Sequence, residues 1–365
     1  MQVHPPGVPH SAAEVHMASS SFAFRALLKK INPDSSHAEV AQRLPGEVRD
    51  WLKEHDYETV APHSRLIGSY GRQTAILDIK DVDTLLFLPD SAQERTPEAV
   101  LRELKSLLDD YPDASAEAAP QRRSIRLDFA DHDLCMDIVG AVAKEGIDQP
   151  LWVPDRQKKD WIQSDPLGYG KSLSVANNDH GKKLVPLIKL MKGWRDVHMV
   201  TRRPKSYLLE VIVYWSVVDG HVVLPGKSTA ENVCDLFEHL AAKWEELMDE
   251  GDGVPRVKDP QLGFVLSTGW QRSHFETFMR RVREAAAAAR KAVDAETDED
   301  ASGHWAKVFG DLWPTEEEVK EEARAAVPAA RPGTAHISSS GRVGAAAGAA
   351  SFLSRSTTYH GPTER

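Results

Sequence analysis

The chain has 365 residues, of which 41% are hydrophobic, a formal net charge of -10, and two cysteines, Cys135 and Cys234. This composition is typical of a globular protein with room for two lobes, and the negative charge argues against a general nucleic-acid binder while leaving direct nucleic-acid binding open. Two cysteines exclude a disulfide framework and a cysteine-built zinc site. Together with the lack of a signal peptide and of a long apolar run, they predict a cytoplasmic protein without contact to a membrane.

Apolar spacing in the first half predicts alternating helices and strands. Residues 1–18 are rich in Pro, His and Ser and are expected to be disordered. A helix from residue 21, a break at 32–34 and a longer helix to about residue 55 follow. The later elements are, in order, a strand end and turn at 67–72, a strand at 82–88, a helix at 97–111, and strands at 124–129 and 134–142. A loop-rich segment is expected from there to about residue 181.

The second half is predicted to be helical. From about residue 328 the chain is rich in Ala, Gly, Ser and Arg without periodicity, so we expect disorder there. The fold class expected from this order of elements is α+β (mixed α/β), with two lobes at 19–165 and 166–327 and a cleft between them. Helical spacing covers residues 183–197, 207–218, 232–247 and 273–293, and an acidic linker is expected before 305–314.

Three aspartates are candidates for binding a metal ion. Asp81 and Asp83 are two residues apart on a strand, so both side chains point to the same face. Asp137 lies in an otherwise apolar strand, where a carboxylate is costly unless it is paired or liganded. Clustered carboxylates repel one another, and Mg²⁺, which prefers carboxylate and phosphate oxygens, relieves that repulsion. A solvated pair remains the alternative for Asp81 and Asp83, and other acids compete with Asp137 for the third position: Asp128, Asp131 and Asp133.

A Gly-Ser turn precedes these acids. Gly68 permits close approach of a ligand to the backbone, and Ser69 offers a hydroxyl and an amide to an anion. The dipeptide alone is common. Its position just before two acids on an apolar strand predicts metal-dependent transfer of a nucleotide.

A basic segment at 175–205 carries eight Lys or Arg against two Asp. Within it, Lys189 and Lys192 are neighbours on one helix face, and a lysine there can neutralise a triphosphate; the alternative is a solvated face. Ser206 can bind phosphate oxygens. Tyr207 can stack on a base, or it can pack as a core aromatic.

Together these residues resemble the DNA polymerase β-like nucleotidyltransferases and, more narrowly, the bacterial cGAS/DncV-like nucleotidyltransferases (CD-NTases). That family makes cyclic oligonucleotide signals in anti-phage (CBASS) defence. The resemblance covers about residues 21–314, most of the chain. It rests on the sequences at 68–76 (GSYGRQTAI), 161–166 (WIQSDP), 187–194 (LIKLMKGW) and 309–314 (FGDLWP).

The resemblance implies a bilobal polymerase β-like core with a mixed sheet, followed by an all-helical C-terminal lobe. It implies two metal ions, Mg²⁺ with Mn²⁺ as the alternative, and NTP substrates, ATP or GTP or both. The product is a cyclic di- or trinucleotide that acts on a separate effector, and pyrophosphate is released. The implied catalytic and metal-binding residues are Asp81, Asp83 and Asp137. The implied nucleotide-binding residues are Gly68, Ser69, Lys192 as the triphosphate lysine, Ser206 as its partner, and Tyr207 as the stacking residue.

Two other functions stay open at this point. One is a transferase that adds nucleotides to an RNA end or to a protein, and the other is a nucleotide sensor without activity. The identity of the bases, the ring size, the linkage and the need for a regulatory partner protein also stay open. The chain has no inserted zinc-binding cluster like that of the animal DNA sensor, so activation by DNA is not implied.

Overall fold

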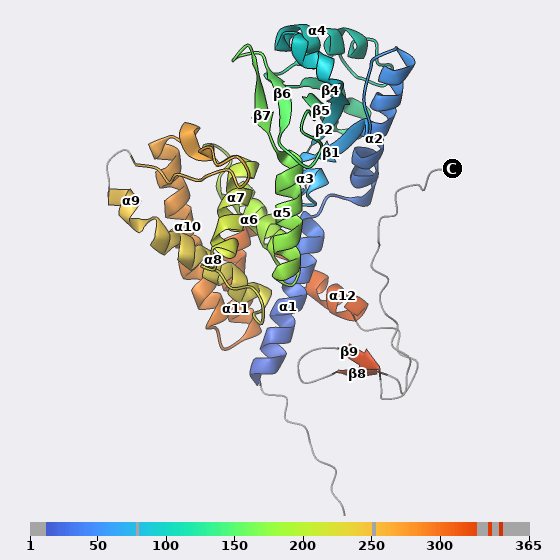
Figure 1. Ribbon diagram of the computed structural model, residues 1–365. Coiled ribbons are helices and arrows are strands. Elements are labelled where there is room, and N and C mark those ends of the chain that lie inside the picture. The colour runs from blue at the N-terminus through green and yellow to red at the C-terminus, as the bar shows by residue number, and fades with distance from the viewer. Residues whose placement is uncertain (1–11, 78–79, 250–252, 327–334, 338–342, 346–365) are drawn as a thin grey trace, which may run out of the picture.

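The computed structural model describes residues 12–77, 80–249, 253–326, 335–337 and 343–345. A lobe built around a mixed sheet and a lobe built from helices meet near α3 (Gly68–Gly71) and α5 (Pro166–Asp179), as Figure 1 shows. The predicted α+β architecture with a helical C-terminal lobe is confirmed. Among the helices that the structure describes, none combines the length and the apolar character needed to cross a bilayer.

The first helices begin and end where the sequence predicts a break. α1 (Ala12–Ile31) ends just before Pro33, which has no amide hydrogen with which to extend a helix. α2 (Ser35–Glu54) begins after Asp34, whose carboxylate caps it. Further along, α4 (Pro97–Leu108) has proline in its first turn, where no amide hydrogen is needed.

Seven strands form one mixed sheet in the order β1-β2-β5-β4-β3, with β6 paired to β5 and β7 paired to β6. β2 and β5 are parallel neighbours, and the other pairs are antiparallel. The strands are β1 (Ser64–Ile67), β2 (Asp81–Leu88), β3 (Ala119–Pro120), β4 (Ile125–Phe129), β5 (Leu134–Val142), β6 (Leu151–Asp155) and β7 (Asp160–Ser164).

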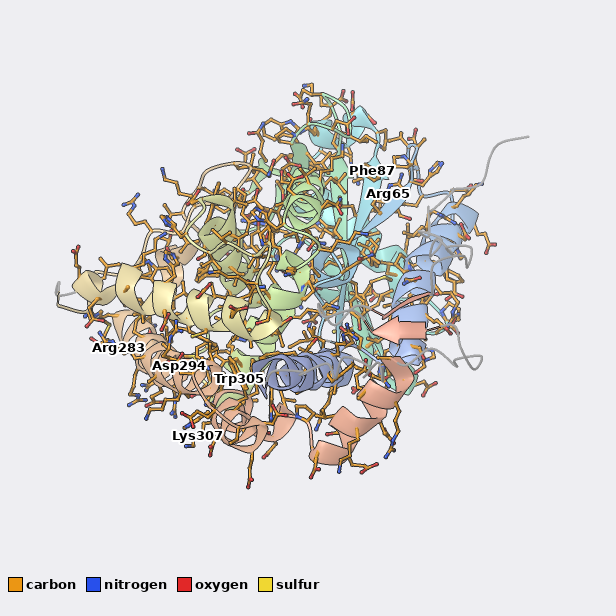
Figure 2. All side chains as sticks on the ribbon, turned by 90° about the horizontal axis from the view of Figure 1, so that it is seen from below. Arg65, Phe87, Arg283, Asp294, Trp305 and Lys307 are labelled. Carbon is orange, nitrogen blue, oxygen red and sulfur yellow. The ribbon has the colours of Figure 1, made fainter. Side chains whose placement is uncertain are left out.

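The alternation of β2 sorts its side chains onto two faces of the sheet. Val82 and every second residue after it lie on the face that α2 and α4 cover. Phe87, labelled in Figure 2, lies on the other face, in a buried cluster with residues of β5 and β6. Asp81 and Asp83 share the face of Phe87 but lie at the start of the strand, outside that cluster. The same alternation that buries the strand therefore leaves both carboxylates near its exposed end.

The loop predicted between β5 and α6 (Leu184–His198) is wrong, because this segment contains β6, β7 and α5. The two strands have only five residues each, and α5 has Gly, Ser and Asn in place of an apolar stripe, so periodicity gives little signal. The start of α5 is instead fixed by its cap. The Asp165 carboxylate accepts the amide hydrogen of Gly168 at 2.7 Å, and Pro166 begins the helix.

The helices of the C-terminal lobe share one core, and α1 completes it. Trp194 packs edge to face against Phe237 and Phe278, with ring centroids 4.9 and 5.8 Å away. Phe24 of α1 packs in the same way on Trp305, 4.9 Å away, and Figure 2 shows Trp305 beside α1. The N-terminal helix thus joins the C-terminal lobe. Its remaining helices are α7 (Ser206–Val218), α8 (Thr229–Lys243), α9 (Glu245–Asp249), α10 (Arg272–Val293), α11 (Asp298–Phe309) and α12 (Glu316–Ala326).

The acidic linker predicted before Trp305 is also wrong, because these acids form the first turn of α11. Thr297 caps the helix by accepting the amide hydrogen of Asp300 at 3.1 Å. Carboxylates in a first turn interact favourably with the positive end of the helix dipole. The helix predicted over 232–247 is divided into α8 and α9 at Trp244.

The two ends predicted to be disordered are described only in part. Residues 12–18 belong to α1, and Ala335–Ile337 (β8) pairs antiparallel with Val343–Ala345 (β9). The other residues of 1–18 and of 328–365 lie outside the described part of the chain.

Candidate active site between the lobes

The three predicted acids lie together at the start of two parallel strands. Asp83 of β2 is directly beside Asp137 of β5 in the strand register, and Asp81 precedes them on the same face. The Asp81 side chain is 57% exposed and that of Asp137 is 16% exposed. Burial, and then the nearby Asp137 carboxylate, raises the pKa of Asp83 to about 6. Their mutual repulsion gives this end of the sheet a preference for a cation.

The backbone of Gly68 lies directly against this acid site. Gly68 has a φ of +64°, a left-handed conformation that glycine adopts easily. A Cβ atom at this position would lie 1.9 Å from Oδ2 of Asp83, which is far inside a van der Waals contact. Gly68, Ser69 and the two acids of β2 line the same cavity. Any side chain at position 68 would therefore displace a carboxylate of the site.

Arg126 of β4, which the sequence analysis does not single out, bridges two of the acids. Its Nη2 donates to Oδ2 of Asp137 at 2.7 Å and to Oδ1 of Asp81 at 3.0 Å, and its Nε donates to Oδ1 of Asp137 at 3.2 Å. The thiol of Cys135 also donates to Oδ1 of Asp81, at 2.9 Å. Hydrogen bonding to Asp137 raises the pKa of Arg126 further above its ordinary value. A permanent positive charge thus lies between the carboxylates.

A cavity of about 850 Å³ lies in the cleft between the lobes. The sheet lobe contributes the Gly-Ser turn, the acids of β2 and Arg126, whereas the helical lobe contributes Arg195, Arg203 and Ser206. The volume is within the range of small-molecule sites. Both walls carry charges of both signs, since Asp196 and Glu210 also line the helical side and Lys80 also lines the sheet side. Arginine side chains can bind phosphate oxygens.

A buried ionic network beside the cavity joins the two lobes. Glu210 of α7 accepts hydrogen bonds from Nε of Arg72 at 2.6 Å, Oγ1 of Thr74 at 2.8 Å and Nζ of Lys192 at 2.9 Å. The Glu210 and Lys192 side chains are fully buried, and that of Arg72 is 10% exposed. Burial alone would raise the pKa of Glu210, but Lys192 and Arg72 hold it at about 2. Because Arg72 and Thr74 directly follow α3, the network fixes the Gly-Ser turn against the helical lobe.

Lys192 is part of this network and does not lie on a solvated helix face, so that alternative is wrong. Its Nζ donates to the carbonyl oxygen of Thr74 at 2.9 Å, to Oγ1 of Thr74 at 3.0 Å and to Oε2 of Glu210 at 2.9 Å. An ammonium group has three hydrogens, so all of them have partners. Burial lowers the pKa of Lys192 despite Glu210. Direct contact with a triphosphate stays a prediction, and it requires exchange of one of these bonds.

Ser206 is paired with Arg195 in this structure. Nη1 of Arg195 donates to Oγ of Ser206 at 2.9 Å, and Nη2 lies 2.7 Å from Asp196, which also binds Arg203 at 2.8 Å. Ser206 and Lys192 do not contact each other here, because the Lys192 ammonium is directed to Thr74 and Glu210, and their joint binding of a triphosphate stays a prediction. The predicted basic segment does contribute Arg195 and Arg203 to the cavity wall.

Tyr207 lies between the main cavity and a second cavity of about 780 Å³. Its hydroxyl donates to Oδ2 of Asp259 at 2.8 Å, and its ring contacts the edge of Tyr169, with the centroids 5.3 Å apart. The guanidinium carbon of Arg72 lies 5.4 Å from the Tyr207 ring centroid. The partly buried ring borders both cavities, and base stacking on it stays a prediction.

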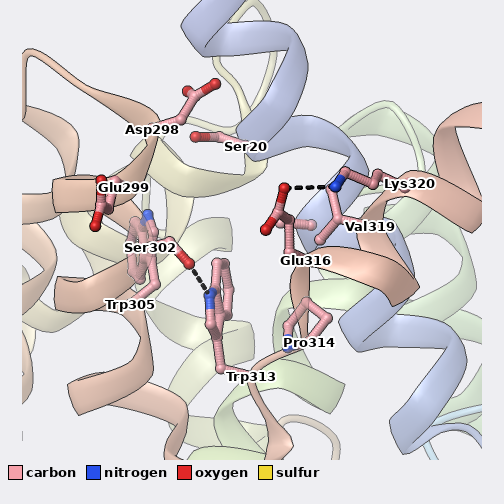
Figure 3. A pocket seen from close by; sticks show the side chains of 11 residues that line it. Ser20, Asp298, Glu299, Ser302, Trp305, Trp313, Pro314, Glu316, Val319 and Lys320 are labelled. Atoms are coloured by element: carbon pink, nitrogen blue, oxygen red, sulfur yellow. Dashed lines mark hydrogen bonds and ion pairs between the residues drawn. The ribbon is translucent and has the colours of Figure 1, made fainter.

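A third cavity, shown in Figure 3, lies apart from this cleft. It measures about 620 Å³ and lies among α1, α11 and α12. Two of its polar contacts are internal, since Nε1 of Trp313 donates to Ser302 and Lys320 pairs with Glu316. No predicted site residue lines it. We therefore place the candidate active site in the cleft between the lobes.

Sequence reasoning missed Arg72, Arg126 and Glu210. Glu210 had a readable signal, because it is the single acid in the otherwise apolar helix α7. The other two had none. The role of Arg126 depends on β4 lying beside β5, and that of Arg72 depends on how the two lobes pack together.

The acid site fits a divalent cation by the type of its residues. Carboxylate oxygens are the ligands that Mg²⁺ prefers. Burial, and then repulsion from Asp137, raises the pKa of Asp83, and a cation would relieve the repulsion. Within the described ranges, no group of three His, Cys, Asp or Glu side chains is arranged to hold a metal. The Arg126 guanidinium lies between Asp81 and Asp137.

This combination of a mixed sheet, acids on parallel strands, a Gly-Ser turn and a helical second lobe resembles the polymerase β-like nucleotidyltransferases. Residues 17–177 match the SMODS family, described as the Second Messenger Oligonucleotide or Dinucleotide Synthetase domain. A cyclic AMP-AMP-AMP synthase of Acinetobacter sp. (strain ATCC 27244 / 9458) is 27% identical over 304 residues, which cover 80% of this chain and 84% of that protein.

Solved structures show the same fold. E. coli MS115-1 CdnC, with ATP, has a TM-score of 0.63 at 19% identity, and the similarity covers 82% of this chain and 99% of CdnC. Vibrio cholerae DncV, bound to GTP, has a TM-score of 0.53 at 16% identity, covering 84% and 89% of the two chains. Together the family match over residues 17–177, the sequence relatives and the solved structures indicate a bacterial enzyme similar to the cGAS/DncV-like nucleotidyltransferases (CD-NTases).

Proposed function

We propose that this CD-NTase joins ATP into a cyclic trinucleotide, releases pyrophosphate at each step, and signals through a separate effector in CBASS defence. The observation that carries the proposal is the register of Asp83 with Asp137, with Asp81 and Gly68 beside them in a cleft to which the helical lobe contributes Arg195 and Arg203. The choice of ATP and of three units is supported by the similarity to a cyclic AMP-AMP-AMP synthase over most of both chains.

In this proposal, Asp81 and Asp83 would hold two Mg²⁺ ions, and Asp137 would complete the site of one of them. When bound, the ions lower the pKa of the attacking ribose hydroxyl and neutralise the departing pyrophosphate. The hydroxyl attacks the α-phosphate in line, so the new bond forms opposite the bond that breaks. The sheet fixes all three carboxylates on rigid strands, which suits a reaction that depends on alignment.

The walls of the cleft hold the nucleotide. We assign the β- and γ-phosphates to the backbone at Gly68 and Ser69 and to the pair of Arg195 and Ser206. Lys192 supports them from the buried network, where it holds Thr74 and Glu210 in place and contributes positive charge. The exposed part of the Tyr207 ring stacks on a base, and stacking of this kind accepts any base.

We extend the proposal to a regulatory partner protein. A solved structure is a complex of E. coli CdnC, 18% identical to this chain, with HORMA-deltaN. The test compares turnover of ATP by the purified chain alone and after addition of the proteins encoded next to it. Equal turnover in both cases would contradict this part of the proposal.

The activity is tested with purified full-length chain, Mg²⁺ and labelled ATP, GTP, CTP and UTP, singly and mixed, without any acceptor. A phosphatase-resistant product with the mass of three linked AMP units is expected. The double variant Asp81→Asn with Asp83→Asn should make none, whereas Asp133→Asn, a competing acid with a 66% exposed side chain, should be active. Undiminished turnover by the double variant, or strict dependence on an RNA or protein acceptor, would contradict the proposal.

A further inference from the structure

We propose that Arg126 is an internal counter-cation of the acid site, which holds Asp81 and Asp137 together in the nucleotide-free protein and must leave before divalent cations bind. The inference deepens the proposed function and rests on it in one respect, namely that these acids are the metal ligands. It gives Arg126, on β4, the role of positioning the carboxylates of Asp81 and Asp137.

The position of Arg126 is determined by the sheet. Arg126 lies directly across from Asp137 in the antiparallel pair of β4 and β5, and β5 lies between β4 and β2. To reach Oδ1 of Asp81, the side chain therefore crosses β5. A guanidinium presents several N–H groups in a rigid plane, so one side chain can bind two carboxylates, whereas an ammonium group acts as a compact point charge.

Arg126 and a metal ion compete for the same oxygens. Both oxygens of Asp137 and one oxygen of Asp81 already accept hydrogen bonds from Arg126. A divalent ion bound to the same carboxylates would also be repelled by the adjacent guanidinium. Metal affinity in the nucleotide-free protein is therefore reduced, and it rises when Arg126 is displaced.

The nucleotide supplies a new partner for Arg126. The side chain is 31% exposed and lines the cavity that we assign to the triphosphate. A guanidinium binds phosphate oxygens, like carboxylate oxygens, through strong and often bidentate hydrogen bonds. Binding of nucleotide and binding of metal are thereby coupled, and the coupling is reciprocal. The metal site is completed only when substrate is present.

The test measures Mn²⁺ binding to the nucleotide-free full chain by electron paramagnetic resonance of free Mn²⁺, so it does not depend on activity. Arg126→Gln should bind Mn²⁺ about tenfold or more tightly than the wild type, the scale of a hydrogen bond to a charged group. Arg126→Lys keeps the charge without the planar fork and should lie between the two. Arg122→Gln, whose native side chain binds Asp155 and lines neither cavity of the cleft, should not change the affinity.

Two further variants separate the possible failures. Lys80→Gln removes a positive charge from the same cavity. If Lys80→Gln and Arg126→Gln raise the affinity for Mn²⁺ equally, the effect comes from the net charge of the cavity and not from the position of Arg126, and the inference is overturned. Unchanged affinity in Arg126→Gln would overturn it as well. Asp83→Asn should weaken Mn²⁺ binding; if it does not, the metal assignment in the proposed function fails first. Circular dichroism confirms that each variant is folded.

Discussion

Replacement of Glu210 by glutamine should destabilise the protein strongly, because Glu210 is the anionic member of the network that joins the lobes. Its fully buried carboxylate accepts bonds from Arg72, Thr74 and Lys192. The substitution keeps the shape but leaves two buried cations without their counter-charge. Breaking a buried ion pair in this way costs about 3–5 kcal/mol.

The depressed pKa of Glu210 gives a similar magnitude. A fall of this pKa from 4.5 to about 2 corresponds to about 3 kcal/mol of folding stability, fully present above pH 4.5. Burial of Lys192, which lowers its pKa, acts in the opposite direction. We therefore expect a net loss of about 3 kcal/mol in the free energy of unfolding at pH 7.

The assay is urea unfolding at pH 7, followed by circular dichroism and tryptophan fluorescence. Glu238→Gln is the matched control, because Glu238 pairs with Arg290 near the surface, where such pairs contribute about 0–1 kcal/mol. The double variant Glu210→Gln with Lys192→Met should recover part of the loss, since it no longer buries an unpaired ammonium. A free energy of unfolding for Glu210→Gln within about 1 kcal/mol of the wild-type value would show that the buried network does not stabilise the junction of the lobes.

Three further predictions follow from the site. Gly68→Ala should lower ATP turnover at least about a hundredfold in steady-state assays, because the added Cβ would meet Asp83. Gly181→Ala is the control and should be active, because Gly181 has a similar φ of +65° and no atom within 4 Å of the added Cβ. Equal losses of turnover in the two variants would contradict this prediction. Tyr207→Phe should retain the KM for ATP within about threefold, and Tyr207→Leu should raise it about tenfold, the scale of one stacked base; equal KM values would exclude stacking. Wild-type stability should fall as the pH drops from 4.5 toward 2 and Glu210 is protonated, and in acid-unfolding curves the Glu210→Gln variant should lack this part of the loss.

Sequence patterns predicted the elements that have strong periodicity. The period of two in β5 and the spacing in α4 and α10 result from one buried face, and the apolar run of β2 is buried on both faces. These elements therefore lie close to where we expected them. The hairpin of β6 and β7 and the helix α5 were missed, because short strands and a polar helix carry little periodic signal. Their positions depend on a cap and on packing with distant segments.

For the candidate site, the sequence predicted the acidic residues but not the contacts between them and the cations. Spacing alone placed Asp81 and Asp83 on one face, and an acid in an apolar strand marked Asp137. The partner of each cation was not predictable, because Lys192 meets Glu210 and Arg126 meets Asp81 only through the packing of distant elements. The signal that marked Asp137 also applies to Glu210, so an isolated acid in an apolar helix merits the same attention as one in a strand.

The most direct test of the central claim is mass spectrometry of the product that the purified full-length chain makes from mixed NTPs and Mg²⁺, with and without its genomic neighbours. We expect a phosphatase-resistant cyclic trinucleotide of AMP units, formed together with pyrophosphate. The product should be absent when Asp81 and Asp83 are both replaced by asparagine. Pyrophosphate release only in the presence of an RNA or protein acceptor, or full product formation by the asparagine variant, would contradict the claim.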